Sequence, residues 1–446
     1  MFGTYEGYVL PYTELTEKNE LSKAFFDIVE KEQEIIERLK TFLPEYKAQL
    51  TNGIKEHLDF GAEDENFTIC EQEICSGCSA CANVCPQKCI TMQPDSEGFL
   101  RPVIDYSQCI KCKKCINTCP VANKPKDKYK EPKAYMVYNQ DDDQRKNSSS
   151  GGVFVALVEK VLKEDGVVFG AVVDSDCVVR HKYCTSVEEL PAFLKSKYVQ
   201  SEIGNAYTQA KEFLQEGKKV LFCGTPCQIG GLYAVLGKDY PNLIAIDFIC
   251  HGVASPKVLE KYKNFRENKA KSKATKISFR DKTKGWKEYS LKMTFENLAE
   301  YSATVKEDLY LRGFVGNLYL RKSCARCSFK QMTRQSQLTL ADFWGANQFL
   351  NEPNDDKGIS LVLAHGESGE QLLDSIKESL FIQEVPFDKA TKGNKSYLLS
   401  VDHSPYRRVF FKKLDKKRID KNISRNVKVN LFSKIRKAYY KFIRCE

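Results

Sequence analysis

Two short cysteine motifs constrain this chain more than any other feature. CSGCSACANVCP, residues 75–86, is followed by CIKCKKCINTCP, residues 109–120, and each ends with a proline directly after its fourth cysteine. A loop with a thiol at every third residue holds three corners of a cubane, while the fourth cysteine points away toward a partner cluster. Each copy is therefore typical of a [4Fe-4S] cluster of the bacterial ferredoxin type, and the repeat predicts a dicluster domain.

The exchange of the fourth cysteine gives the ligand assignment. A pair of zinc knuckles also uses C-x2-C units, but zinc sites seldom need four cysteines at this spacing before a proline, twice. Cys70 and Cys89 fall outside the pattern and are interpreted as plain thiols near the clusters. We predict one cluster on Cys75, Cys78, Cys81 and Cys119, and the other on Cys109, Cys112, Cys115 and Cys85.

The length and composition of the chain indicate a globular protein and limit how its cysteines can be used. The chain has 446 residues, of which 42% are hydrophobic and 29% charged, so it is long enough for two or three globular domains. No apolar run approaches the length of a spanning helix, and the N-terminus lacks the basic-then-apolar layout of a signal peptide. We therefore expect a cytoplasmic protein, in which the 18 cysteines are metal ligands or redox groups rather than disulfides.

The segments after the dicluster motifs alternate between helical and strand patterns. This order predicts an α/β domain with a mixed, partly parallel sheet, following the α+β dicluster ferredoxin domain. In such sheets ligands gather beyond the carboxyl ends of the strands. The predicted helices span 152–166, 202–217, 225–237 and 255–268, and the predicted strands span 167–173, 218–224 and 242–250.

We divide the chain into four parts. They are a helical N-terminal extension (1–65), the 2x[4Fe-4S] ferredoxin-type domain (66–123), the α/β domain (134–405) and a basic tail (406–446). The tail holds fifteen Lys and Arg against three Asp and Glu, a charge of +12, and the remaining 54 basic and 56 acidic residues leave the rest at −2. Its mixture of basic and apolar residues allows peripheral membrane contact, or packing on the body through the apolar side. Nucleic acid is not expected as a partner, because no binding module accompanies the charge.

A second group of thiols lies in the α/β domain. Cys227 falls in the first turn of the predicted helix 225–237, where the helix dipole favours its thiolate. Cys324 and Cys327 form a C-x2-C unit, which is also compatible with a redox pair or half a zinc site. With Cys250 these residues make four thiols for a third [4Fe-4S] cluster, and Cys223 is the competing candidate for the position of Cys227.

The stretch SSSGG, residues 148–152, directly precedes a predicted helix. Small residues there let backbone N–H groups approach a phosphate, although Ser and Gly at this place also serve as ordinary caps. No G-x-G-x-x-G follows a strand and no phosphate-binding P-loop occurs, so a dinucleotide is not expected to bind in the Rossmann manner.

Together these pieces resemble the beta subunit family of coenzyme F420 hydrogenase/dehydrogenase. With the dicluster motifs, the resemblance covers residues 70 to about 400. One departure is Gln337, at a position where relatives often carry an acid, while Asp342 and Trp344 are retained. The matching stretches are SSSGGVF (148–154), KSKYVQS (195–201), FCGTPCQIGGL (222–232), DFICHGVASP (247–256), FRDKTKGW (279–286) and KSCARCSFK followed by LTLADFWG (322–345).

The resemblance implies an iron–sulfur flavoprotein oxidoreductase. A flavin, FAD in characterised relatives, would lie beside the third cluster, exchange a hydride with a soluble substrate or deazaflavin-like carrier, and pass single electrons to the clusters. It also implies that Cys227, Cys250, Cys324 and Cys327 are the third-cluster ligands. The implied phosphate contacts are Ser149, Ser150, Gly151 and Gly152, and the residues implied to line the flavin pocket are Lys197, Tyr198, Gln200 and Ser201. No catalytic residue is assigned.

The alternative is an electron-transfer module that relays electrons to a partner protein and binds clusters without flavin. Some relatives of this kind are linked to polysaccharide biosynthesis. Both functions require a redox partner protein or a soluble electron carrier, and the small-molecule substrate stays open. The more than 250 residues that follow the dicluster motifs favour the oxidoreductase, because a relay needs little beyond the dicluster.

Overall fold

A computed structural model describes residues 67–124, 129, 131–351 and 354–427 of the chain. The described residues from Thr68 onward belong to one compact unit. The dicluster motifs and the α/β domain therefore belong to the same unit. The predicted helical extension, 1–65, lies outside the described residues.

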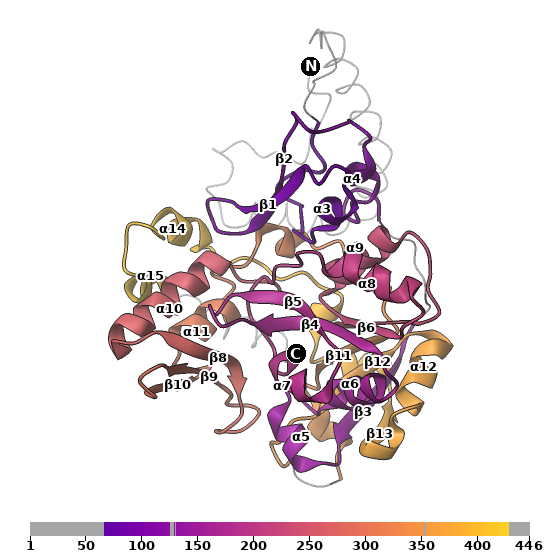
Figure 1. Ribbon diagram of the computed structural model, residues 1–446. Coiled ribbons are helices and arrows are strands. Elements are labelled where there is room, and N and C mark those ends of the chain that lie inside the picture. Colours follow the sequence, from indigo (N-terminus) through magenta and orange to yellow (C-terminus); the bar gives the residue numbers. More distant parts are fainter. Residues whose placement is uncertain (1–66, 125–128, 130, 352–353, 428–446) are drawn as a thin grey trace, which may run out of the picture. The chain divides into compact units, whose positions relative to one another are not determined.

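The dicluster region is a small α+β assembly (Figure 1). Strand β1 (Ile90–Pro94) pairs antiparallel with β2 (Leu100–Ile104). Helix α3 (Ala80–Val84) carries the third cysteine of the first motif, and α4 (Lys114–Asn117) carries the third cysteine of the second. The two motifs thus repeat in structure as well as in sequence, as the spacing predicts.

The α/β domain is built on one eight-stranded sheet. Four neighbouring strands at the centre of this sheet are parallel, and the strands on either side of them pair antiparallel. This confirms the predicted mixed, partly parallel sheet. The strand order is β13 (Leu380–Val385), β3 (Lys133–Asn139), β12 (Ser360–Ala364), β11 (Leu338–Asp342), β7 (Leu243–Phe248), β6 (Val220–Cys223), β4 (Val167–Val173) and β5 (Val179–Cys184).

Helices cover both faces of this sheet because its side chains alternate between two cores. Leu221 belongs to the core beneath α6 (Val153–Lys163), whereas the next residue, Phe222, belongs to the core beneath α8 (Ala206–Gln215) and α9 (Pro226–Leu236). These helices and strands occur where the sequence predicts them, with ends shifted by a few residues. The remaining helices around the sheet are α5 (Asp142–Asn147), α7 (Leu190–Phe193), α12 (Gly366–Asp374) and α13 (Phe387–Thr391).

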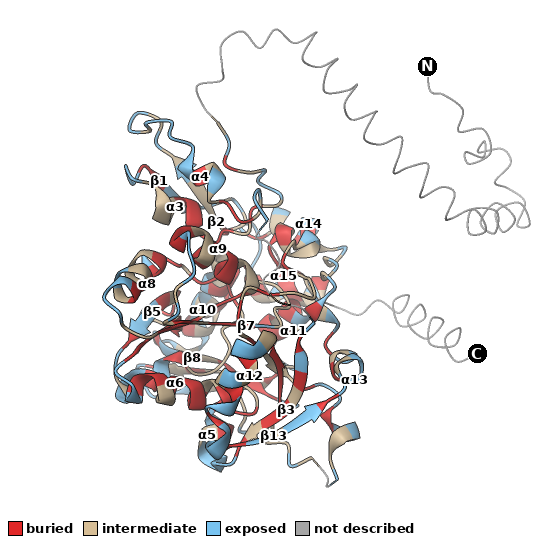
Figure 2. Ribbon diagram, turned by 90° about the vertical axis from the view of Figure 1, so that its right-hand side faces the viewer, coloured by how far each residue is buried: buried red, intermediate tan, exposed pale blue. Residues whose placement is uncertain are grey.

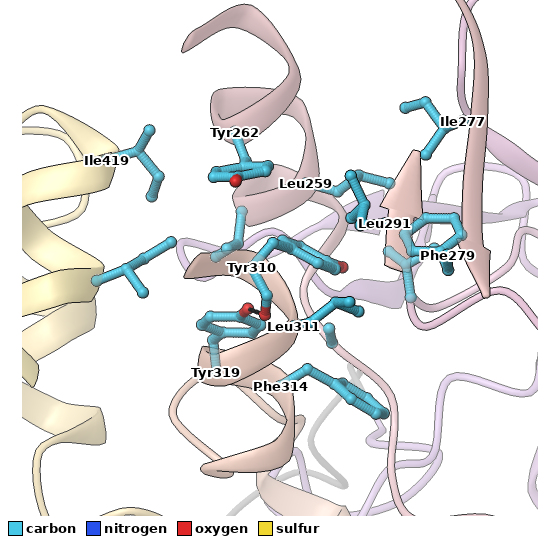
Figure 3. Close-up of a cluster of buried hydrophobic side chains, with 14 of the residues drawn as sticks. Leu259, Tyr262, Ile277, Phe279, Leu291, Tyr310, Leu311, Phe314, Tyr319 and Ile419 are labelled. Atoms are coloured by element: carbon cyan, nitrogen blue, oxygen red, sulfur yellow. Dashed lines mark hydrogen bonds between the residues drawn. The ribbon is translucent and has the colours of Figure 1, made fainter. Parts of the chain in front are cut away.

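A further core, which we call the tyrosine core, lies beside a three-stranded antiparallel sheet that the sequence patterns did not predict. Tyr262, Tyr310 and Tyr319 gather there among leucine and isoleucine side chains (Figure 3). The Tyr262 hydroxyl donates to Asp308 Oδ2 at 2.5 Å, so its polar end is satisfied inside this core. The elements are β8 (Ala274–Asp281), β9 (Ser290–Phe295) and β10 (Glu300–Thr304), with α10 (Pro256–Ala270) and α11 (Leu309–Val315).

The first half of the predicted basic tail belongs to the body of the protein. Helix α15 (Ile419–Asn426) packs on α10 and α11, and Ile419 lies beside Tyr262 in the tyrosine core (Figure 3). Helix α14 (Arg407–Lys412) packs on α15, and its Phe410 contacts Tyr319. In Figure 2 buried and exposed residues alternate along these two helices. Of the two alternatives for the tail, residues 407–426 thus follow packing on the body through the apolar side. The boundary at 406 stays a prediction, and residues 428–446 lie outside the described residues.

No helix within the described ranges is long and apolar enough to cross a membrane.

Candidate functional site

A cavity of about 800 Å³ opens beyond the carboxyl ends of the parallel strands. Cys223 at the end of β6, Phe248 at the end of β7 and Asp342 at the end of β11 all line it. This is where an open α/β sheet binds its ligands. Residues of the dicluster region, Ser76 and Gly77, form part of the same wall.

Four thiols of the α/β domain meet at this cavity. Cys227, Cys250, Cys324 and Cys327 all line it. Cys227 lies close enough to Cys250 and Cys327 for their charges to interact, and the charge of Cys250 also interacts with that of Cys324. Cys223 also lines the cavity, but its charged neighbours are Asp247 and Lys197 instead of these thiols. The geometry thus groups Cys227 with the other three predicted ligands, whose role in a third cluster stays a prediction.

The helix that carries Cys227 begins as the sequence predicts. Thr225 caps α9 in a capping box with Gln228, and Pro226 occupies the first turn. Thr225 Oγ1 lies 3.1 Å from Cys227 Sγ. Burial nevertheless raises the pKa of the Cys227 thiol well above its usual value, and burial raises that of Cys250 to about 12. Such thiols ionise readily only when a metal replaces the proton.

Lys330 is a cation beside these thiols that the sequence patterns did not identify. Its charge acts on Cys250, Cys324 and Cys327, while its Nζ donates to the Ser396 carbonyl at 2.6 Å and to the Cys250 carbonyl. Burial lowers the pKa of Lys330. A cation held at this place favours an anionic thiolate group.

The dicluster thiols form two groups in which the fourth cysteines are exchanged. Cys81 lies within charge–charge range of Cys75, Cys78 and Cys119, so the fourth cysteine of the second motif joins the first motif. We call these four the inner thiol group, because all of them are buried.

The other group faces solvent. Cys115 lies near Cys109 and Cys112. Cys85 is connected to these thiols by Cys89. The Sγ of Cys89 lies 3.4 Å from Cys85 Sγ, and Cys89 also interacts with Cys109. We call Cys85, Cys109, Cys112 and Cys115 the outer thiol group, since Cys112 is exposed and both Cys85 and Cys109 are half-buried.

The two cysteines outside the motifs lie beside these groups, as predicted. The Cys70 thiol hydrogen-bonds to the sulfurs of Cys75 and Cys119. These two hydrogen bonds lower the pKa of Cys75 to about 5 and the pKa of Cys119 to about 6. Cys89 is buried next to the outer thiol group. In the described part of the chain, no three His, Cys, Asp or Glu side chains converge as the ligands of one metal ion would. The ligands of a cubane each bind a different iron.

The inner thiol group adjoins the thiols of the cavity. A Cβ atom on Gly231 of α9 would lie 3.3 Å from the Sγ of Cys78, so Cys78 packs directly against this helix. Gly231 is one helical turn beyond Cys227, and the charges of Cys78 and Cys227 interact. The first motif therefore meets the third group of thiols without intervening secondary structure.

Arg321 joins the same two regions and has no sequence signal of its own. It is fully buried, with an exposed fraction of 0%. Its Nε donates to the Cys75 carbonyl at 2.8 Å, and its Nη2 lies 3.8 Å from the Cys75 sulfur. Three residues further on, Cys324 is close enough for charge–charge interaction with it. The guanidinium thus sits between the inner thiol group and the cavity.

The predicted phosphate loop lines the cavity, but its hydroxyl groups are engaged within the protein. Ser149 Oγ shares a hydrogen bond with Ser196 Oγ at 3.0 Å, and Ser150 Oγ donates to the Ile359 carbonyl at 2.7 Å. These serines hold the loop in place. The Ser150 hydroxyl has thus used its one proton, whereas the Ser149 hydroxyl keeps its proton for a phosphate when Ser196 is the donor of their hydrogen bond.

The two glycines of the loop are required by packing. A Cβ on Gly151 would lie 2.5 Å from the Val137 carbonyl oxygen, and the Gly151 N–H donates to Ser360 Oγ at 2.9 Å. Gly152 has φ +90° and is the N-cap of α6. The first-turn N–H groups that follow it, at Val153 and Phe154 on the cavity wall, are the donors that this loop offers to an anion.

Lys197 and Tyr198 line the cavity in different ways. Lys197 Nζ donates to three carbonyls at the end of α7, the shortest of these bonds being 2.8 Å to Leu194, and burial lowers its pKa to about 7. Tyr198 stacks on Phe314 with ring centroids 4.6 Å apart. Its hydroxyl accepts from Arg280 Nη1 at 2.8 Å.

The amide of Gln200 and the hydroxyl of Ser201 are occupied by protein groups. Gln200 Oε1 accepts from the Leu100 N–H at 3.0 Å and from Arg321 at 3.3 Å, so this side chain binds the dicluster region. Ser201 Oγ accepts from Gln228 Nε2 at 2.9 Å. Both residues lie on the cavity wall, and their role as flavin contacts stays a prediction.

Arg280 organises the cavity wall, although the sequence assigned it no role. Its guanidinium binds Asp342 at 2.9 Å, and its Nε donates to the Ser149 carbonyl at 2.9 Å. Trp286 Nε1 also donates to Asp342, and its ring stacks on Trp344 with centroids 5.0 Å apart. Trp344 itself is 38% exposed and lines the cavity. FRDKTKGW and LTLADFWG are thus joined through one buried ion pair.

Two further residues near the sheet and the cavity are held by hydrogen bonds. Gln337, which stands where relatives often carry an acid, accepts from the Ala245 N–H at 2.8 Å and donates to the Leu243 carbonyl at 2.9 Å, so it ties β11 to β7. His251 lines the cavity and lies 2.6 Å from Asn317 Oδ1, and burial lowers its pKa.

The charge of the cavity wall is strongly positive. Nine Lys and Arg residues line it, against two Asp, Asp247 and Asp342. Asp342 is already paired with Arg280, and burial raises the pKa of Asp247. The wall therefore suits an anionic ligand.

Comparisons with known proteins agree with this picture. Residues 217–390 match the family model for the C terminus of the coenzyme F420 hydrogenase/dehydrogenase beta subunit, and residues 74–123 match the 4Fe-4S dicluster domain. The chain carries a domain of this beta-subunit family. The resemblance predicted from the sequence is confirmed, and the chain is an iron–sulfur electron-transfer protein related to that family.

Two similar proteins from Methanocaldococcus jannaschii match parts of the chain. One, described as uncharacterized, is 27% identical over 201 residues, which cover 37% of this chain and 53% of that protein. The other, described as polyferredoxin-like, is 38% identical over 58 residues, which cover 11% of this chain and 34% of that protein. The chain thus spans about half of the first relative's length and about a third of the second's.

Among solved structures, a chain of the F420-reducing [NiFe] hydrogenase complex from Methanosarcina barkeri is similar. It is 18% identical, with a TM-score of 0.40, and the match covers 66% of this chain and 90% of that one.

Proposed function

We propose that this chain is an iron–sulfur flavoprotein oxidoreductase, which passes electrons between [4Fe-4S] clusters and a flavin that exchanges a hydride with a soluble substrate or a deazaflavin-like carrier. One observation supports this function above all. A single cavity is lined both by the loop Ser149–Gly152 and by the thiols of Cys227, Cys250, Cys324 and Cys327. A flavin, when bound, supplies the conversion between two-electron and one-electron chemistry.

The residues of the cavity fit such a group. Its volume of about 800 Å³ falls in the range of cofactor sites. The N–H groups at the start of α6 and the excess of Lys and Arg suit the phosphates of a flavin nucleotide. Trp344 and Tyr198 offer aromatic surfaces on the wall, and the four thiols are the soft ligands that iron–sulfur clusters use.

The order of the thiol groups supports a path for electrons. The outer thiol group faces solvent, the inner thiol group is buried, and Cys78 of the inner group packs on the helix that carries Cys227. This order of thiol groups supports the proposed sequence of one-electron sites from the surface to the cavity. A relay without flavin would need neither the cavity nor the Ser149–Gly152 loop.

The test compares two cysteines that line the same cavity. We expect Cys227→Ser, purified without oxygen, to lose about four irons per chain relative to the wild type, because each [4Fe-4S] cluster holds four. Cys223→Ser should keep the wild-type iron content, since Cys223 lies among Asp247 and Lys197. In the wild type, a one-electron donor that reduces the clusters should also bleach the flavin absorbance, and in Cys227→Ser this bleaching should slow markedly.

Two results would count against the proposal. Loss of four irons in Cys223→Ser alone would transfer the ligand role to that residue. A wild-type protein that carries clusters but no flavin would contradict the oxidoreductase and leave the electron relay.

A further inference from the structure

The surface over the outer thiol group has an unusual charge. Residues 110–114, with the sequence IKCKK, are all exposed, and Ile110 is 58% exposed. Lys111, Lys113 and Lys114 stand on either side of Cys112, which is itself exposed. We call this stretch the lysine face.

The backbone at two of these lysines is strained. Lys111 has φ +54° and Lys113 has φ +55°, in the left-handed region where a residue with a Cβ atom is disfavoured by roughly 1–2 kcal/mol. The equivalent positions of the first motif are Gly77, at φ +68°, and Ser79, at φ +65°. Glycine is the residue that such a position usually takes. The second motif therefore places two lysines at a cost in stability, and nothing in its packing requires them.

The charge of the lysine face is directed outward. In the described part of the chain, none of Lys111, Lys113 and Lys114 takes part in an ion pair, so no acidic side chain neutralises the charge around Cys112. Asp105, an acid nearby in the sequence, already accepts from Ser107 and Gln108. Three positive charges thus surround the thiol of the dicluster region that is most accessible to solvent.

We infer that the lysine face is the docking surface for an acidic one-electron carrier protein, which exchanges electrons with the cluster of the outer thiol group. This inference rests on the proposed function. Opposite charge steers such a partner to the surface, and exposed Ile110 offers a small apolar contact of the kind that brief redox encounters use. One electron passes between the carrier and the cluster, so that one is oxidised as the other is reduced, and no bond or proton changes.

The experiment measures electron transfer from a reduced acidic ferredoxin to the anaerobic holoprotein by stopped flow. The triple variant Lys111→Gln, Lys113→Gln, Lys114→Gln should lower the second-order rate constant about tenfold or more at low salt, and it should abolish most of the salt dependence. Reduction by methyl viologen radical, a small cation that needs no such surface, should stay at the wild-type rate.

A matched control separates this face from charge in general. Lys269, Lys271 and Lys276 are exposed lysines on α10, at its C-cap and on β8, and Lys271 has φ +53°, like Lys111. Their triple exchange to glutamine should leave the ferredoxin rate unchanged. Should the first triple variant lose iron, Lys114→Glu provides the test alone, because Lys114 lies in α4 with ordinary helical backbone.

The outcomes separate the docking surface from the proposed function. Equal ferredoxin rates in the wild type and the lysine variants, with iron content unchanged, would overturn the docking surface even where methyl viologen reduces every centre. Lysine-dependent binding to vesicles of anionic lipid, with no change in the ferredoxin rate, would also overturn it and would assign the face to a membrane. Absence of flavin in a protein with a lysine-dependent ferredoxin rate would contradict the oxidoreductase and leave the docking surface standing.

Discussion

The two cysteine motifs have the same spacing but opposite surroundings. Between the first and third cysteines, the first motif has Ser-Gly and Ser-Ala, and the second has Ile-Lys and Lys-Lys. Ala80 is 0% exposed, whereas its counterpart Lys114 is exposed. The cysteines satisfy the same local requirement in both copies, while the residues between them are set by what each copy faces. The first faces the third group of thiols, and the second faces solvent.

The largest effect should come from Gly77. A Cβ atom there would lie 2.6 Å from Gln200 Nε2 and 2.8 Å from the Leu100 carbonyl oxygen, and φ is +68°. We expect Gly77→Ala to lower the free energy of unfolding by roughly 2–4 kcal/mol and to reduce the iron content. Anaerobic denaturant titration and iron analysis measure both quantities.

The matched variant in the second motif is Lys111→Ala. It keeps the same backbone conformation at an exposed position, so its free energy of unfolding should stay within about 0.5 kcal/mol of the wild type. Equal losses in the two variants would break the contrast between a packed and a solvent-facing motif.

Arg321 should distinguish the two clusters by their reduction potentials. Its buried guanidinium donates toward Cys75 and stabilises negative charge on the inner thiol group, whereas the lysines beside the outer group are exposed to solvent, which screens their charge. We expect Arg321→Gln to make the potential of the inner cluster more negative by about 60 mV, a tenfold change for one electron. Potentiometric titration followed by EPR measures it, and the outer cluster should not shift.

Arg321→Lys is the control, because it keeps the positive charge. If the reduction potential of the inner cluster in Arg321→Lys lies close to the wild-type value, the shift in Arg321→Gln is due to the lost charge. Equal shifts of both clusters in Arg321→Gln would instead indicate general disruption of the dicluster region.

A smaller difference should separate Asn83 from Asn117, which occupy equivalent places in the two motifs. Asn83 Nδ2 donates to the Gly204 carbonyl at 2.8 Å, and its Oδ1 accepts from Thr208 Oγ1 at 3.2 Å, whereas Asn117 is exposed. Asn83→Ala should cost about 1 kcal/mol of unfolding free energy, and Asn117→Ala should cost close to none. Thermal denaturation of the two variants side by side would reveal a reversed order.

The smallest expected effect is a gain. Lys111→Gly removes the left-handed strain of a residue with a Cβ atom, so the protein should become more stable by roughly 0.5–1 kcal/mol after the entropy of glycine is counted. Denaturant titration measures the gain. A loss of stability would show that Lys111 has a structural role, which would weaken the docking surface.

The sequence predicts those parts of the molecule whose requirements are local. The reach of a thiol to an iron spans a few residues, so the spacing of Cys75, Cys78 and Cys81 identifies the cluster type. The helix that carries Cys227 is likewise predicted by Thr225 and Pro226 beside it. The parallel strands follow from their apolar runs, and the cavity then lies at their carboxyl ends.

The remaining features depend on residues far apart in the chain. Gln200 bonds the backbone of Leu100, and Arg280 holds the loop at Ser149, pairings that no local pattern indicates. Arg321 could be any basic residue until the fold brings it to Cys75. The mixture of basic and apolar residues in the tail leaves packing and membrane contact both open, because it does not reveal that Ile419 is buried in the tyrosine core.

The measurement that tests this account most directly is the iron and flavin content, per chain, of wild-type protein purified without oxygen. The account predicts about twelve irons and one flavin, as three [4Fe-4S] clusters beside one cavity require. About eight irons and no flavin would contradict it, because the thiols of Cys227, Cys250, Cys324 and Cys327 and the cavity that they line would then hold neither group.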